Sequence, residues 1–346
     1  MHECSKPCSL VSILSQYNQN SNLERYISNR LDLPQFPELH ESMLNVIVVL
    51  LDQDLMKNDP KKKTQHQLLD QLDIFLAILE KLMFQHIHRA NKKLTKKSQR
   101  FSSTFLTNLE KLVKRVCHLM AQIKSAGLAE RCVDDVTAKA TESLALGTVK
   151  AASMALTKFF STIFWICEVG FVCKLIASML NDEVLSFHND EQTIFLRIEI
   201  IKKLSEHEVW VPINFPNFQD LNMKSLKLTR AFCERHYLVG ELLRLVQFAL
   251  TCNTPKAAQI RKRTLEVFIS VLTKHCLDNR YGGQKEQTRI VQLFAPFIGF
   301  LTRHFYHLNI DMHEFKVFER NPSIRSTATE FQKQLQEQAT DIGKIK

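Results

Sequence analysis

Three ionisable residues stand together at Glu206-His207-Glu208, inside the stretch SEHEVWVPINFP that spans residues 205–216. An imidazole titrates near neutral pH and carboxylates tune it, so the cluster has the residue types of a general acid and base. The alternative is structural, because a histidine at the end of a helix can satisfy the last carbonyl groups and complement the helix dipole. No catalytic template accompanies the triplet, and we favour the structural interpretation.

Three groups of histidine and cysteine contain residue types that bind metals. None of them has four ligands in paired spacing, which is the pattern of a strong zinc signal. We therefore expect structural or solvent-exposed roles, and no bound metal, for His2, Cys4 and Cys8, for His304, His307 and His313, and for His86 and His88.

The common catalytic motifs are missing from the sequence. There is no G-x-x-x-x-G-K-S/T loop, G-x-G-x-x-G turn, H-E-x-x-H helix or G-x-S-x-G elbow, and the chain has only 8 glycines for loops that could hold a phosphate. His207-Glu208 begins like the zinc-protease motif, but Val211 occupies the position of the second histidine. We predict no cofactor and no catalysis by this chain.

The elements that must position these residues are predicted to be helices. Only 8 Gly and 9 Pro occur in 346 residues, and intervals such as 61–126 have neither, whereas sheets need many more turn residues. Apolar residues recur at spacings of three and four, which is typical of an amphipathic helix. In the first part of the chain we expect helices over 39–56, 67–88, 105–123, 136–146, 149–180 with a break at Gly170, and 191–204.

The second part of the chain predicts three antiparallel helices joined by short loops. The first covers 232–252. The second begins with Thr254 as its cap and Pro255 in its first turn, and Gly282 and Gly283 in the following loop are stop signals. The third covers 285–308 and contains Pro296, which should bend it. The sequence therefore predicts an all-α, armadillo- or HEAT-like α-solenoid of stacked antiparallel helices, with a compact bundle as the alternative.

The cysteines and the hydropathy of the chain indicate the cellular compartment in which we expect it. Nine scattered cysteines are typical of reduced core thiols and not of a disulfide framework. No secretory signal opens the chain, and its most apolar window, 159–173, is too short for a membrane span and contains Glu168. We expect a cytoplasmic protein that can also associate peripherally with membranes.

Most of the net charge of +10 lies between residues 57 and 100. A local basic segment fits an acidic protein or an acidic lipid surface as partner, although charge runs commonly just face water. Aromatic residues do not alternate with the basic ones, so we expect no nucleic-acid partner. The candidate contacts to an acidic surface are Lys61, Lys62, Lys63, Lys92, Lys93, Lys96 and Lys97.

The prolines that follow the charged triplet predict a rigid corner. Pro212 and Pro216 favour extended backbone at the residue before each of them, and Trp210, Val211, Ile213 and Phe215 would then pack on neighbouring helices. The residues assigned to this corner are His207, Glu208, Trp210, Pro212, Asn214 and Pro216.

Several ordered blocks of sequence resemble the dedicator-of-cytokinesis family, and its zizimin branch most closely. They are HEVWVPINFP from residue 207, FQDL from 218, FCERHYLVGELLR from 232 and LDNRYGGQKEQTRIVQLFAPFIGFL from 277, with weaker matches at SQRF (98–101) and VGFVCKLI (169–176). The resemblance is dense over 195–308, thin over 67–185 and not traceable in the first sixty residues. The family-motif residues are His236, Gly240, Arg244, Asp278, Arg280, Tyr281, Arg289, Pro296 and Gly299.

The resemblance implies a helical linker between a lipid-binding C2-like module and an exchange module for Rho-type GTPases, with neither module in this chain. It implies other modules of a larger exchange factor as partners and only indirect contact with the GTPase. Val209 replaces a second histidine that the family usually has, and Asn279 replaces an aspartate, which favours packing over a functional histidine pair. We expect four regions: 1–60 without a family match, 61–185 with the basic segment, 186–310 with the strongest match, and a polar tail over 311–346.

Two functions follow. The first is the scaffold of a guanine nucleotide exchange factor for Rho-family GTPases, lacking the exchange module. The second is a stand-alone α-solenoid adaptor that binds acidic protein or membrane surfaces through its basic segment.

Overall fold

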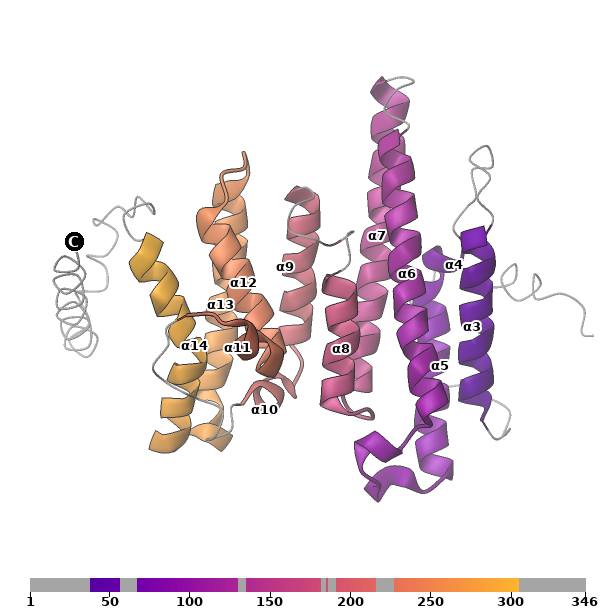
Figure 1. Ribbon diagram of the computed structural model, residues 1–346, viewed down its shortest axis with the longest axis horizontal. Helices are drawn as coiled ribbons and strands as arrows, with labels where there is room; N and C mark the ends of the chain where they lie inside the picture. Colours follow the sequence, from indigo (N-terminus) through magenta and orange to yellow (C-terminus); the bar gives the residue numbers. More distant parts are fainter. Residues whose placement is uncertain are drawn as a thin grey trace, which may run out of the picture. The chain divides into compact units, whose positions relative to one another are not determined.

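A computed structural model describes residues 38–56, 67–129, 135–181, 185, 191–215 and 227–304. These residues form α-helices and short 3-10 turns without a strand, so the all-α prediction is confirmed (Figure 1). The chain divides into two compact units, one ending at Ile213 and the other beginning at Asn214. No helix among the described residues is both long and apolar enough to cross a bilayer.

The first unit stacks its helices in two layers. One layer has α6 packed between α3 and α8, and the other has α7 packed between α5 and α9. The layers contact each other through α3 with α5, α6 with α7, and α7 with α8. This is the stacking of an α-solenoid. The bounds are α3 Leu39–Met56, α4 Gln67–Asp70, α5 Leu72–Arg89, α6 Ser103–Ala129, α7 Asp135–Ile163, α8 Val169–Leu180 and α9 Glu191–Ser205.

Three predicted helix boundaries in this unit are wrong. The stretch 136–163 is one continuous helix, α7, where we expected two. The expected break at Gly170 instead lies at residues 164–168, and Gly170 belongs to the first turn of α8. A glycine costs a helix only about 1 kcal/mol relative to alanine, which packing on several neighbouring helices offsets. The predicted helix over 67–88 is also interrupted, at Gln71.

A buried arginine closes the end of α8. Arg197 on α9 is 3% exposed, and its Nη1 donates to the carbonyl oxygens of Leu180 and Leu185. Leu180 is the last residue of α8, so its carbonyl has no partner within that helix. The guanidinium therefore supplies donors that the helix end lacks, and it ties α9 to the segment that follows α8.

In the second unit, α12 contacts α11, α13 and α14. The three predicted long helices are present, with two corrections. The first is broken at His236, and the second begins at Ala257 with Lys256, not Thr254, at its cap position. The helix α14 continues through Pro296. The bounds are α11 Arg230–Arg235, α12 Tyr237–Thr251, α13 Ala257–Leu277 and α14 Gln284–His304, while α10, Trp210–Asn214, spans the boundary between the units.

Gly240 permits a close helix contact between α11 and α12. A Cβ atom at this position would lie 2.8 Å from the Cα atom of Cys233, and backbone cannot give way as a flexible side chain would. The family-motif glycine is thus explained by packing.

Substituting Gly240 by alanine is expected to lower the free energy of unfolding by about 1–3 kcal/mol, because the added methyl group forces α11 and α12 apart. Gly147 is the matched control, since nothing lies within 4 Å of its added Cβ, and Gly147→Ala inside α7 should stabilise by about 0.5–1 kcal/mol. Urea denaturation of both variants measures the difference. Equal effects would contradict the close contact.

Candidate functional site

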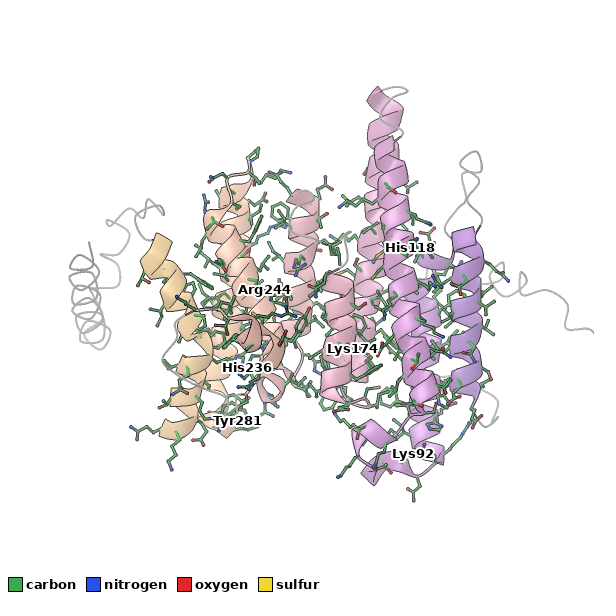
Figure 2. The ribbon with its side chains drawn as sticks, in the orientation of Figure 1. Lys92, His118, Lys174, His236, Arg244 and Tyr281 are labelled. Carbon is green, nitrogen blue, oxygen red and sulfur yellow. The ribbon has the colours of Figure 1, made fainter. Side chains whose placement is uncertain are left out.

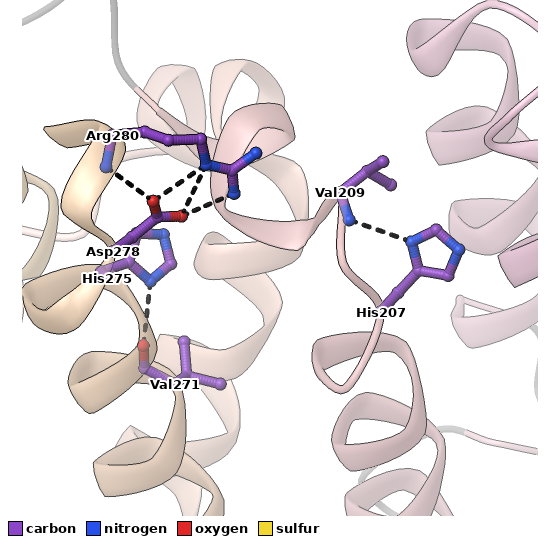
Figure 3. Close-up of polar contacts among 6 residues, drawn as sticks. All are labelled: His207, Val209, Val271, His275, Asp278 and Arg280. Carbon is purple, nitrogen blue, oxygen red and sulfur yellow. Dashed lines mark hydrogen bonds and ion pairs between the residues drawn. The ribbon is translucent and has the colours of Figure 1, made fainter.

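The imidazole of His207 satisfies a backbone N–H group just after α9. Its Nδ1 accepts from the Val209 amide at 3.2 Å (Figure 3). We expected the ring to serve the last carbonyls of α9, and this hydrogen bond reverses that role. The reason is that a new helix, α10, begins three residues later, and the first N–H groups before and within a helix need acceptors.

The stretch after His207 is helical, which corrects the expected extended run. Val211 lies inside α10, and the Ile213 amide donates to the Val209 carbonyl at 3.0 Å. Pro212 is tolerated because it stands in the first turn of that helix, where its missing N–H would have no intrahelical acceptor. Trp210 and Asn214 are buried, at 1% and 2% exposure. The corner is therefore a short helix, and Pro216 lies outside the described residues.

The carboxylates beside His207 do not form a catalytic arrangement. Glu206 pairs with Lys203 at 3.1 Å, and the side chain of Glu208 is exposed. The imidazole packs against aromatic rings, with centroid distances of 5.3 Å to Trp165 and 6.1 Å to Phe164. The structure thus joins the corner to the connection between α7 and α8.

The loop between α5 and α6 closes the C-terminal end of α7. Lys97 Nζ donates to the Phe164 carbonyl at 2.7 Å, and Arg100 Nη1 lies 3.4 Å from the carbonyl oxygens of both Trp165 and Ile166. These carbonyls follow the last turn of α7, where the helix dipole is negative and intrahelical donors are missing. Two cations of the basic segment therefore stabilise a helix end.

The same loop is held together by its own cations. Arg100 Nε donates to the Thr95 carbonyl at 3.1 Å and Nη2 to the Lys93 carbonyl at 2.9 Å, while Lys92 Nζ donates to the Arg100 carbonyl at 3.0 Å. Lys92 lies in the connection that extends past the ends of α5 and α6 (Figure 2). Burial, and then the charge of Arg100, lower the pKa of Lys97.

Only some of the candidate lysines remain open to a partner. The side chains of Lys93 and Lys96 are exposed, and their ammonium groups make no hydrogen bond or ion pair within the part of the chain that the structure describes. Lys92 and Lys97 bind carbonyl oxygens, and Lys61, Lys62 and Lys63 lie outside the described residues. The lysines of the basic segment thus fall into two groups: those that bond carbonyl oxygens and those that lie free on the surface of the described part of the chain.

A cluster of aromatic rings lies beneath this loop. His40 of α3 packs against His86 of α5 with ring centroids 4.0 Å apart and the ring planes tilted by 36°, and Phe101 and Phe105 complete the cluster. His86 Nε2 lies 3.2 Å from both Lys92 Nζ and the Arg100 carbonyl, so its tautomer decides which of them it pairs with. His40 is 2% exposed, and burial, followed by the charge of His86, lowers its pKa to about 4.

In the second unit, the family-motif residues after α13 form a compact turn. The Asp278 carboxylate accepts from the backbone amide, Nε and Nη2 of Arg280, and these side-chain hydrogen bonds lower its pKa (Figure 3). Tyr281 stacks on Phe215 with centroids 4.0 Å apart, and the Arg289 guanidinium lies 4.3 Å from the Phe215 centroid. Asp278, Arg280, Tyr281 and Arg289 therefore fix one turn and the segment beside it.

The motif residues of α12 also make internal contacts. His236 stands at the break between α11 and α12, and Arg244 Nη1 bonds the buried Glu241 carboxylate at 2.6 Å. His275, at the end of α13, is fully buried; its Nδ1 lies 2.9 Å from the Val271 carbonyl, and burial lowers its pKa. Pro296 and Gly299 are buried in α14. These residues are spread over several helix ends and do not assemble into one catalytic site.

The His and Cys groups considered as possible metal ligands do not come together among the described residues. Among the described residues, no three His, Cys, Asp or Glu side chains converge as metal ligands. His86 belongs to the aromatic cluster and His88 is exposed, while the first group and two members of the second, His307 and His313, lie outside the described ranges. The cysteines within those ranges are free thiols, and burial raises the pKa of Cys167 and of Cys173 to about 12.

These observations define the protein as an all-α helical array. Its distinctive polar residues make hydrogen bonds at helix ends and in turns. The chain is similar to dedicator-of-cytokinesis proteins. Protein 9 from Mus musculus and from Homo sapiens is 28% identical over 295 residues, which cover 82% of this chain and 13% of that protein. Protein 11 from Danio rerio is 23% identical over 78% of this chain and 13% of its own length.

These similarities confirm the resemblance seen in the sequence blocks at the level of homology to dedicator-of-cytokinesis proteins. The chain spans only about an eighth of the curated relatives it matches. No family model matches the chain, and no solved structure matches it.

Sequence reasoning missed three residues that organise this region. Trp165 was hidden in an apolar window, although 46% of its surface is exposed. His40 and Arg197 gave no signal, because their roles depend on rings and carbonyls that lie far away in the sequence. Arg100 entered only as one positive charge among many.

Proposed function

We propose that this chain is a helical scaffold segment of a guanine nucleotide exchange factor for Rho-family GTPases, of the zizimin type, and does not itself catalyse exchange. The observation that carries the proposal is the role of the family-motif residues. Gly240 allows a close helix contact, Asp278 and Arg280 fix a turn, and Arg244 satisfies a buried carboxylate. Residues shared with the family for these reasons support architecture and not chemistry.

Such a segment acts by holding other modules at a defined spacing. Stacked helices contact mainly their neighbours and present long surfaces, which suits a linker between a membrane-directed module and a GTPase-directed module. The partners in this proposal are the other modules of the exchange factor, and the GTPase is contacted only indirectly. The location is the cytoplasm, with peripheral association at membranes.

The isolated chain is expected to leave nucleotide release from Rac- and Cdc-type GTPases at the intrinsic rate. Release of a fluorescent guanine nucleotide from the loaded GTPase measures this, and chelation of Mg²⁺ provides the positive control for releasable nucleotide. Stimulation that depends on the concentration of the chain would contradict the assignment as a scaffold without exchange activity.

The second candidate function is a stand-alone adaptor that binds acidic protein or membrane surfaces. The exposed side chains of Lys93 and Lys96, which make no ion pair among the described residues, favour it. Binding that disappears when the seven candidate lysines are neutralised discriminates this function from the first, and unchanged binding counts against it.

A further inference from the structure

The loop between α5 and α6 and the connection between α7 and α8 carry exposed lysines and an exposed tryptophan. The indole of Trp165 is 46% exposed in the connection between α7 and α8. Arg100 bonds the Trp165 carbonyl with Nη1 and the Lys93 carbonyl with Nη2, so one guanidinium holds the two backbone segments side by side. The backbone at Trp165 and at Lys93 therefore lies at the same place in the first unit, and the side chains of Trp165, Lys93 and Lys96 are all exposed there.

This surface is strongly basic. Lys93 and Lys96 are exposed, and Lys92, Lys97 and Arg100 of the same loop are partly buried. The acidic side chains around these segments are Glu41, whose carboxylate accepts from Ser102 Oγ at 2.7 Å, Glu38, whose charge together with that of Glu41 acts on His86, Glu168, three residues after Trp165, and Glu208, next to the His207 ring on which Trp165 packs. The cations outnumber these carboxylates, so the surface attracts anions at long range.

The side chains fit a diffuse anionic surface better than one acidic peptide. The carboxylate of an acidic peptide is bound best by the planar guanidinium of an arginine. The N–H groups of Arg100, however, already donate to carbonyl oxygens of the loop and of the end of α7. The long stems of Lys93 and Lys96 keep point charges mobile in water. Tryptophan beside lysine suits the interface of a bilayer, where an apolar ring and a polar N–H are both accommodated.

We propose that Trp165, Lys93 and Lys96 form a docking surface for an anionic lipid bilayer. The inference rests on the second candidate function for the kind of partner, and it holds whether or not the chain is part of an exchange factor. Electrostatic attraction by the lysines brings the surface to the headgroups, and Trp165 inserts at the level of the headgroups.

Co-sedimentation with vesicles tests the surface. The chain should bind vesicles of equal parts phosphatidylserine and phosphatidylcholine, should bind pure phosphatidylcholine much more weakly, and should be released by salt. The double variant Lys93→Gln/Lys96→Gln is expected to bind the anionic vesicles about 25-fold more weakly, at about fivefold per lysine. Trp165→Ala is expected to lose at least about threefold.

The matched control is Lys111→Gln/Lys114→Gln, which removes two exposed lysines of α6 in the same unit and should bind as the wild type does. An equal loss in the control would show that only net charge matters and would overturn the proposed surface. No preference of the wild type for anionic vesicles would overturn it as well.

A further variant separates this inference from the adaptor function. If Lys61→Gln/Lys62→Gln/Lys63→Gln abolishes binding while Lys93→Gln/Lys96→Gln does not, the adaptor function stands and the surface at Trp165 is wrong. Circular dichroism of each variant confirms that the helices are intact.

Discussion

Replacing Trp210 by alanine is expected to lower the free energy of unfolding by about 3–5 kcal/mol. The side chain is 1% exposed at the start of α10, so its removal costs the burial of a large aromatic ring and leaves a cavity beneath the short helix. Urea denaturation followed by circular dichroism measures the loss.

The second tryptophan provides the control. Trp165 is 46% exposed, and Trp165→Ala should cost about 1 kcal/mol or less. A loss below about 1 kcal/mol for Trp210→Ala would mean that the corner does not anchor the fold, and a binding role for it would gain support.

The stability of the first unit is expected to fall by about 2–3 kcal/mol between pH 6.5 and pH 4 because of His40. The pKa of this buried imidazole is lowered from 6.5 to about 4, chiefly by burial and then by the charges of His86 and Lys92, which outweigh the opposing effect of Glu41. In this pH range the unfolded chain binds a proton that the folded chain does not, so acid favours unfolding. Above pH 6.5 the contribution of His40 is fully present.

Equilibrium unfolding of the wild type and of His40→Phe across this pH range measures the effect. The variant keeps a ring in the cluster with Phe101 and Phe105 but cannot titrate, so its stability should fall less on acidification. His86→Phe should raise the pKa of His40 by removing a neighbouring charge and so reduce the fall in part. Identical pH dependence in wild type and His40→Phe would contradict the assignment.

Local sequence signals determined the helices that end at strong boundaries. The helix over 39–56 has the predicted bounds, because an apolar run there is flanked by Pro37 and by the polar stretch after Met56. The boundaries around Gly147 and Gly170 were wrong because tertiary packing decides them. As a whole, α7 packs on α5, α6, α8 and α9, and these contacts outweigh the weak local preference of Gly147, whose own position is open.

The polar roles in the candidate site could be predicted only in part. A structural interpretation of His207 followed from its position near a helix end, but the direction of its hydrogen bond depended on α10, which the two prolines concealed. The charge of residues 57–100 was evident, yet it could not show which cations bind carbonyls. Lys97 bonds to Phe164, which lies 67 residues away in the chain.

The sequence separation between Lys97 and Phe164 has a consequence for how these contacts form during synthesis and folding. The carbonyl acceptors at residues 164–166 are synthesised more than sixty residues after Lys97 and Arg100. During synthesis these two side chains therefore lack the acceptors that they bond in the folded chain. The bonds of Lys97 and Arg100 to these carbonyls form only when the C-terminal end of α7 is present, since closing so long a segment costs entropy before any bond repays it, whereas the bonds within the loop are local. The connection between this loop and Trp165 therefore depends on the packing of α7 in the first unit, and we expect it to form after the local bonds of the loop.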